Sequence, residues 1–196
     1  MDLSGFFKKI NVTQGADCTI SEFCSLENVV LGDSVIIGDG VQLKNVAVGN
    51  GSKIGVNVRL YSPAVAQPVT IGQECWLSYG VFGEATGGEI HIEDYAVIAH
   101  RSLLLTSSGP GKKNAIMDAL YPEEHGPIRI GAYCWLGTQC TLLPGAILSE
   151  GVVLGAHALA RGGVYEAWTV YAGIPAKFLK KFDAQAVAAA KRSLNI

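Results

Sequence analysis

The sequence is poor in charged residues and has no long apolar run. Asp, Glu, Lys and Arg together make up 16% of its 196 residues, and the formal net charge is -2 at pH 7. Such a chain lacks the basic surface that nucleic acids require, while its 49% of apolar residues excludes a disordered chain. It has no stretch of about 18 apolar residues to span a bilayer, and its opening residues, MDLS, lack the features of a secretory signal. We therefore expect a cytoplasmic protein with no membrane span and no nucleic-acid partner.

The five cysteines do not follow a metal-binding pattern. No two of them are separated by two residues, the spacing at which many zinc sites place their thiolates. Four of them instead stand four residues after a large aliphatic residue: Cys24, Cys75, Cys134 and Cys140. Because this position recurs in the repeat described next, we interpret these cysteines as small buried side chains and predict no metal site.

The sequence is rich in a six-residue repeat. Between residues 125 and 163 a large aliphatic residue returns every six positions, at Ile130, Leu136, Leu142, Leu148 and Leu154. A helix period of 3.6 or a strand period of 2 does not produce this spacing. The same repeat, with a slip of one residue before Val48, begins also at Leu31, Ile37, Val48, Ile54, Ile71, Leu77, Ile92 and Ile98. If the aliphatic residue is position i, position i+1 is often Gly and position i+4 is small or β-branched.

A six-residue unit is explained by a short strand followed by a tight bend. Three such sides close a triangular coil of about 18 residues, and stacked coils pair their main chains and bury the aliphatic side chains between them. We expect the Gly at i+1 to supply the positive or bridging φ that a bend requires. The repeat therefore predicts an all-β fold, a parallel β-helix.

The repeats are interrupted at residues 61–69, 83–89 and 107–127, and function is expected at these interruptions. The third is a long loop expected to project from the β-helix, with one helical turn at residues 115–120. From Asp183 onward the sequence predicts a short α-helix with Asp183 as its N-cap. We divide the chain into a β-helix domain, residues 1–182, and a C-terminal helix, residues 183–196.

The C-terminal repeats resemble a known family. "PIRIGAYCWLG", "LLPGAIL" and "VYAGIPAKFLKKF" resemble the last coils and the closing segment of the hexapeptide-repeat acyltransferases, and the resemblance covers roughly residues 20 to 182. It implies a left-handed β-helix and a homotrimer with active sites between neighbouring subunits, reached by the projecting loop. It also implies transfer of an acetyl group from acetyl-CoA to a hydroxyl or amine of a sugar or nucleotide sugar, for example a surface-polysaccharide precursor.

Acyl transfer requires a base to take the proton of the acceptor, and imidazole suits this task at neutral pH. Of the four histidines, His100 is our first candidate, because its repeat resembles the I-x-H-x-x-[VIL] unit of the sugar N-acetyltransferases. That branch usually places an acidic residue beside the histidine, where this sequence has Arg101. We consider Asp94 or Glu93 as sources of a carboxylate.

The second candidate base is His125. The galactoside and maltose O-acetyltransferases carry their histidine in a T-x-x-H-P stretch, and Gly109 stands at that place in residues 106–110. His125, at the far end of the projecting loop, could substitute for it, with Glu123 and Glu124 to orient it. His91 is interpreted as an outward strand residue, and His157 as a contact of the cofactor or a packing residue.

The resemblance also implies the residues that bind the acyl donor and the acceptor. Positions that match the CoA contacts of the family are Thr138, Ala156, Arg161, Gly162, Lys177 and Lys180. Arg161 stands where the family has a lysine and is expected to serve the phosphates. Candidate acceptor contacts are Trp135 and, in the projecting loop, Tyr121 and Glu124.

Two alternatives remain open. A non-catalytic β-helix scaffold is favoured by Gly109, which removes a usual base. A γ-class carbonic anhydrase shares the fold and requires a zinc site of three histidines between subunits. Successive histidines are 9, 25 and 32 residues apart, which does not give the close pair of that class.

Overall fold

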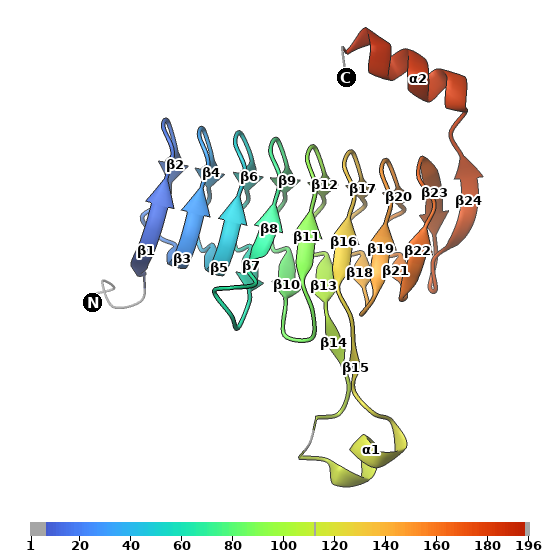
Figure 1. The fold of residues 1–196 in the computed structure, drawn as a ribbon, viewed down its shortest axis with the longest axis horizontal. Coiled ribbons are helices and arrows are strands. Elements are labelled where there is room, and N and C mark those ends of the chain that lie inside the picture. The colour runs from blue at the N-terminus through green and yellow to red at the C-terminus, as the bar shows by residue number, and fades with distance from the viewer. Residues whose placement is uncertain (1–6, 112, 195–196) are drawn as a thin grey trace.

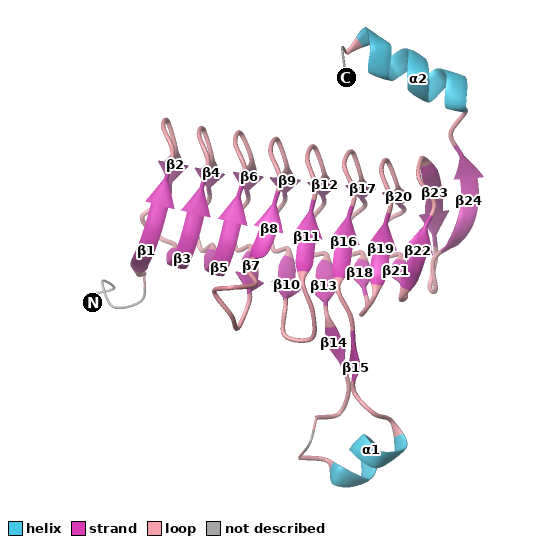
Figure 2. Cartoon of the chain, in the orientation of Figure 1, coloured by secondary structure: helices cyan, strands magenta, loops and turns pink. Residues whose placement is uncertain are grey.

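The structure, a computed structural model, describes residues 7–111 and 113–194, which form a parallel β-helix (Figures 1 and 2). Short strands stack coil upon coil along one long axis, and each coil has three faces. Residues 1–6, residue 112 and residues 195–196 lie outside the described part. The prediction for residues 1–4, and the limits of the two proposed domains at residues 1 and 196, therefore concern residues outside the described part.

The first face of the β-helix is formed by one strand from each of five coils. These are β8 (Val69–Ile71), β11 (Ile90–Ile92), β16 (Ile128–Ile130), β19 (Ala146–Leu148) and β22 (Gly163–Tyr165). The second face is a sheet of nine strands: β2 (Thr19–Ile20), β4 (Ile36–Ile37), β6 (Lys53–Ile54), β9 (Trp76–Leu77), β12 (Val97–Ile98), β17 (Trp135–Leu136), β20 (Val153–Leu154), β23 (Thr169–Ala172) and β24 (Lys177–Lys181).

The third face contains β7 (Arg59–Tyr61), β10 (Phe82–Glu84), β13 (Leu103–Leu105), β18 (Thr141–Leu142) and β21 (Leu159–Ala160). At the N-terminal end, β1 (Lys9–Gln14), β3 (Ser25–Leu31) and β5 (Gln42–Val48) are longer. β5 pairs with β7 through its first half and with β8 through its second half, so it bends from the third face to the first. We call the bends from first to second, second to third and third to first face the first, second and third corners.

The core confirms the predicted repeat. The aliphatic residues at position i point inward and are at most 1% exposed throughout the stretch that defined the repeat: Ile130, Leu136, Leu142, Leu148 and Leu154. The four cysteines at position i+4 are equally buried. Most coils contribute three such side chains, although Gly83 and Ala160 stand at this position on the third face. Burial of apolar surface therefore stabilises the stack along its length.

The expectation that Gly at i+1 supplies a positive φ is wrong. Positive φ occurs at i+3 instead, for example 59° at Tyr133 and 56° at Gln139. Gly at i+1 is required by the close approach of the next coil, since a Cβ added at Gly137 would lie 2.6 Å from the main-chain nitrogen of Ala156. Asp or Asn at i+2 accepts a hydrogen bond from the preceding coil, as when Asp94 Oδ1 accepts from the main-chain nitrogen of Gln73 at 2.9 Å.

All three interruptions leave from the third corner. In the N-terminal coils this corner is a tight turn built on Asn11, Asn28 and Asn45, whose side chains hydrogen-bond to one another at 2.9 Å. Asn45 then donates to the carbonyl of Ser62, where the first interruption begins. Because successive coils stack in register, the three interruptions project on the same side of the molecule (Figure 1).

The longest interruption forms the projecting loop (Figure 1). Its base is a short antiparallel pair, β14 (Ser107–Ser108) and β15 (Glu124–His125), and its tip contains α1 (Ala115–Leu120). The helical turn predicted at residues 115–120 is confirmed. The side chain of Asn114 caps it by accepting from the main-chain nitrogen of Met117 at 3.4 Å.

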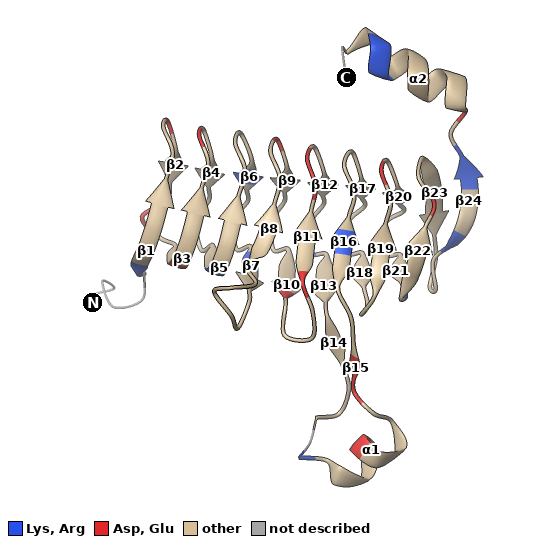
Figure 3. Ribbon diagram, in the orientation of Figure 1, with Lys and Arg blue, Asp and Glu red and all other residues tan. Residues whose placement is uncertain are grey.

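The C-terminal end closes the stack. β24 runs antiparallel to β23 and carries three lysines, which appear as the basic strand in Figure 3. Helix α2 (Ala184–Ser193) follows, and Asp183 caps it as predicted by accepting from the main-chain nitrogen of Ala186 at 2.8 Å. Lys191 of α2 lies 2.6 Å from the Glu150 carboxylate and 5.2 Å from the Trp168 ring centroid. None of the described helices is long and apolar enough to cross a membrane.

Candidate active site

The two candidate bases lie on opposite edges of one face. His100 is in the second corner, between β12 and β13, and His125 is at the third corner, at the base of the projecting loop. Both corners border the third face of the C-terminal coils, formed by β13, β18 and β21. The outward residues across this face are Leu103, Thr141 and Leu159, which occupy matching positions in successive coils.

His100 is joined to two predicted CoA contacts. The Thr138 hydroxyl donates to the main-chain carbonyl of His100 at 3.0 Å, and the main-chain nitrogen of His157 donates to the Thr138 carbonyl at 2.8 Å. His100, Thr138 and Ala156 therefore form one column along the second corner. The His100 side chain is exposed, and its Nε2 lies 3.3 Å from the Ser78 hydroxyl of the preceding coil. Sequence reasoning missed Ser78, although it stands in the corresponding bend one coil earlier.

The carboxylate expected beside His100 is elsewhere. Asp94 and Glu93 lie in the first corner, where the Glu93 carboxylate accepts from the main-chain nitrogen of Ala132 at 3.0 Å. The whole second face separates this corner from His100, so the expectation that these residues orient the histidine is wrong. Arg101, next to His100, instead stacks over the Tyr79 ring at 5.5 Å.

His125 is connected to the second interruption through the base of the projecting loop. It pairs with Ser107 across β14 and β15, and its Nε2 lies 3.7 Å from a Glu123 carboxylate oxygen. The Ser107 hydroxyl is 3.0 Å from that of Thr86 and donates to the Glu84 carboxylate at 3.4 Å. The sequence predicted an interruption at residues 83–89, but nothing in it indicated that Glu84 and Thr86 contact Ser107 of β14, which pairs with His125.

The other predicted CoA contacts lie in the third corner and on the last strand of the second face, β24. Arg161 and Gly162 lie in the third corner, below the exit of the projecting loop, since the main-chain nitrogen of Gly163 donates to the Gly145 carbonyl at 2.9 Å. Lys177 is the first residue of β24. The segment before it contacts β21, because the main-chain nitrogen of Leu159 donates to the Gly173 carbonyl at 3.0 Å. Lys180 lies further along β24, over the ring of Phe182 at 5.7 Å.

The predicted acceptor contacts are not brought together within one chain. Trp135 is 55% exposed on the outer side of the second face, opposite Val97 and Val153. Tyr121, which is 58% exposed, and Glu124 lie in the projecting loop, on the far side of the coil. A site that used all three would need a neighbouring chain.

The buried cysteines behave as packing residues. Burial raises the pKa of the Cys134 thiol to about 12 and that of the Cys75 thiol to about 11, so both are protonated at neutral pH. Within residues 7–111 and 113–194, no three His, Cys, Asp or Glu side chains are grouped to hold a metal ion. His91 is exposed on β11, as interpreted, and its ring nitrogen contacts the Thr70 hydroxyl.

Curated proteins with related sequences are acyltransferases by name, whereas no family model matches the sequence. The putative lipopolysaccharide biosynthesis O-acetyl transferase WbbJ of Escherichia coli is 32% identical over 117 residues, which cover 60% of this chain and 52% of WbbJ. The dTDP-4-amino-4,6-dideoxy-D-glucose acyltransferase of Escherichia coli is 33% identical over 108 residues, 52% of this chain and 56% of that protein. The chain spans about half the length of these relatives.

Solved structures share the fold. The N-acyltransferase AntD of Bacillus cereus, in complex with dTDP and coenzyme A, gives a TM-score of 0.60 at 21% identity, over 95% of this chain and 91% of AntD. A hexapeptide-repeat acetyltransferase of Vibrio cholerae, complexed with acetyl-coenzyme A, gives 0.58 at 17% identity, over 71% of this chain and 72% of that one. At these identities the likeness shows the fold, and the predicted left-handed parallel β-helix is confirmed. Sequence and structure thus both confirm the resemblance to the hexapeptide-repeat acyltransferases that the motifs indicated.

Proposed function

We propose that this protein transfers an acetyl group from acetyl-CoA to a hydroxyl or amine of a sugar or nucleotide sugar, with His100 as general base. The observation that carries the proposal is the column of His100, Thr138 and Ala156 along one edge of the third face. In this column an exposed imidazole stands beside two positions matched to CoA contacts, which supports the assignment. The names of the curated relatives support the same class of reaction.

In this reaction the ring nitrogen of His100 that does not contact Ser78 takes the proton of the acceptor hydroxyl or amine as that group attacks the thioester carbonyl of acetyl-CoA. A tetrahedral oxyanion forms, then collapses with cleavage of the carbon–sulfur bond, and the His100 imidazolium gives its proton to the CoA thiolate. Nε2 carries the ring proton and donates to the Ser78 hydroxyl, 3.3 Å away, which helps to hold the ring. General-base catalysis of this kind contributes roughly 10²- to 10⁴-fold to the rate.

Donor binding is assigned to both edges of the third face. Thr138 and Ala156 line the second corner, Arg161 and Gly162 the third corner, and Lys177 and Lys180 extend from the last coil. The guanidinium of Arg161 contacts the phosphates of CoA, because charge-assisted bonds to phosphate are the strongest that a surface arginine makes.

We further propose a cytoplasmic homotrimer with an active site in each cleft between neighbours. The distribution of candidate residues supports this assembly: Trp135, Tyr121 and Glu124 are dispersed within one chain, and the projecting loop extends away from its own coils (Figure 1). In a trimer the loop of one subunit brings its residues to the third face of the next. Sedimentation analysis tests the assembly, and a monomer would contradict a shared site.

Two observations favour other assignments and set the experiment. His125 lies at the other edge of the third face and is the alternative base. Gly109 stands where the O-acetyltransferases have a histidine, which favours a non-catalytic scaffold. We would measure thiol release from acetyl-CoA with a panel of sugars and nucleotide-linked amino sugars, on wild type, His100→Ala and His125→Ala. Loss only in His100→Ala supports the proposal, and loss only in His125→Ala moves the base to the projecting loop. If wild type neither turns over nor binds CoA, the proposal fails, and zinc content then tests the carbonic anhydrase alternative.

A further inference from the structure

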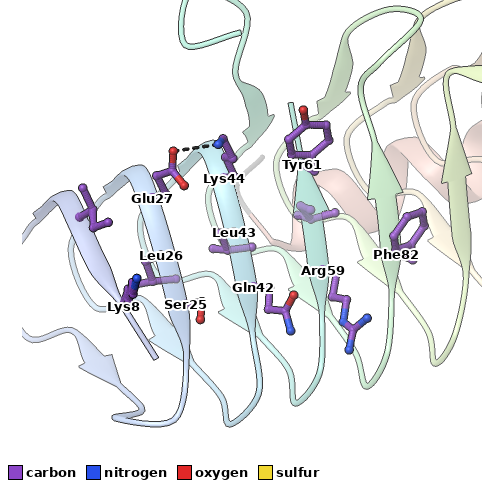
Figure 4. A pocket seen from close by; sticks show the side chains of 12 residues that line it. Lys8, Ser25, Leu26, Glu27, Gln42, Leu43, Lys44, Arg59, Tyr61 and Phe82 are labelled. Atoms are coloured by element: carbon purple, nitrogen blue, oxygen red, sulfur yellow. Dashed lines mark ion pairs between the residues drawn. The ribbon is translucent and has the colours of Figure 1, made fainter. Parts of the chain in front are cut away.

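A groove of about 470 Å³ lies on the third face at the N-terminal end, over β1, β3, β5, β7 and β10 (Figure 4). Its floor is the backbone of the strands, whose leucines point inward to the core. Two rows of outward side chains line it. One row contains Ser25, Gln42, Arg59 and Phe82, and the other contains Glu27, Lys44 and Tyr61. Its volume lies within the range of small-molecule sites.

The groove is positively charged although the chain is acidic overall. Lys8, Lys44 and Arg59 line it against one carboxylate, Glu27, in a protein of net charge -2. Lys44 Nζ lies 2.8 Å from a Glu27 carboxylate oxygen, and this hydrogen bond raises the pKa of Lys44, so the amine stays charged. The Arg59 guanidinium forms no ion pair with any side chain in the described part of the chain and is available to an anion.

Aromatic rings stand beside these cations. Tyr61 lies opposite Lys44 on the neighbouring strand and is 39% exposed, and Phe82 lies opposite Arg59. Partly exposed rings next to an arginine provide a flat apolar surface on which a planar base can stack. The cations and rings together match a ligand that is part anion and part aromatic.

The groove ends at Phe82 of β10, one strand before β13, which follows the bend that carries His100. Phe82 lies opposite Leu103 of β13, and Leu103 comes three residues after His100. Arg59 and Leu103 are two strand spacings apart, roughly 10 Å at about 4.8 Å per strand. A hexose ring and its first phosphate can bridge this span, so a sugar at His100 would place its phosphate near Arg59.

We propose that this groove holds the nucleoside diphosphate of the acceptor, with Arg59 and Lys44 on the diphosphate, Tyr61 against the base, and the sugar over Phe82 toward His100. The inference rests on the proposed acetyltransferase function and narrows its acceptor to a nucleotide-linked sugar. Glu27 competes with the ligand for Lys44, which predicts that removing its charge strengthens binding.

The test is calorimetry of dTDP, pyrophosphate and thymidine with the full chain and single variants. Arg59→Ala is expected to weaken dTDP binding tenfold or more, because a charge-assisted bond to phosphate is lost. Tyr61→Ala should weaken dTDP but leave pyrophosphate unchanged, and Glu27→Gln should tighten dTDP. The matched control is Lys53→Ala, which removes the same charge from β6 on the second face and should change nothing.

CoA binding and sedimentation distinguish a failure of the groove assignment from a failure of the acetyltransferase proposal. Equal binding of dTDP by wild type and Arg59→Ala, or equal weakening by Lys53→Ala, would overturn the groove assignment. If wild type binds CoA but not dTDP, the groove assignment fails and the acetyltransferase proposal stands; if it binds neither, both fail. A change of oligomeric state in Arg59→Ala, seen by sedimentation, would assign the groove to an interface between copies and overturn the inference.

Discussion

The Thr138 hydroxyl donates to the main-chain carbonyl of His100 at 3.0 Å, which ties the bend carrying one candidate base to the next coil. The same bend receives the main-chain nitrogen of Gln139 at 2.8 Å. Two hydrogen bonds from one coil therefore hold the backbone of His100, and only one of them depends on a side chain.

Removing that side-chain bond should affect catalysis moderately. Thr138→Val keeps the shape and loses the hydroxyl, and we expect kcat to fall about fivefold to tenfold, as a net hydrogen bond of about 1 kcal/mol implies. His100→Ala should cost far more, roughly 10²-fold or above. Thiol release measures both. Thr19→Val, the same change on exposed β2, is the control, and an equal loss there would point to a general effect on folding.

Arg161 should act on the donor rather than on the chemical step. Arg161→Ala is expected to raise KM for acetyl-CoA about tenfold with little change in kcat, since a phosphate contact acts equally in ground and transition states. High salt should reduce the difference between variant and wild type. The control is Arg129→Ala, which removes another exposed arginine from β16 on the first face and should leave KM for acetyl-CoA unchanged. A fall in kcat with unchanged KM would contradict the assignment.

The close approach of successive coils can be tested by replacing glycines at position i+1 with alanine. A Cβ at Gly137 would lie 2.6 Å from a main-chain nitrogen, whereas at Gly155 the nearest atom is the Ala172 Cβ at 3.0 Å. Gly137→Ala should therefore reduce the free energy of unfolding by about 1–3 kcal/mol, and Gly155→Ala by less, because a side chain yields more easily than a backbone. Urea unfolding measures both, and equal losses would show that the inter-coil distance does not decide the effect.

The five cysteine thiols should differ in reactivity according to how deeply each is buried. Cys24, Cys75, Cys134 and Cys140 are buried, and burial raises the pKa of each, whereas Cys18 is partly exposed. At pH 7 we expect a thiol reagent to modify Cys18 alone in the native protein and all five cysteines in urea. Mass spectrometry after modification locates the sites. Rapid native modification of Cys134 would show that the last coils open.

The repeat was predictable because its cause is local and periodic. An inward aliphatic residue every six positions is what each face requires, so Ile130 and Leu136 could be placed in the core without a structure. The asparagine turn had a signal too: Asn11, Asn28 and Asn45 are 17 residues apart, one less than the 18 of an undisturbed coil. This explains the slip of one residue before Val48.

The arrangement of the candidate site was less predictable. The interruptions break the count of residues per coil, so the sequence could not show that His100 and His125 fall on opposite edges of one face. The repeat did imply the separation of Asp94 from His100, since the two stand at the same position of successive six-residue units and therefore at successive corners. The role of Gly137 was misjudged because the atoms that exclude a side chain there belong to another coil.

The antiparallel strand β24 also decides where the stack can end. Parallel coils leave unpaired main-chain groups on their last member, and such an edge can recruit another chain into a fibre. Here β24 reverses direction, shifts register between Val170 and Tyr171, and carries Lys177, Lys180 and Lys181. Charged, irregular edges resist edge-to-edge addition. The reversed strand β24 therefore protects the second face from end-to-end addition of another chain.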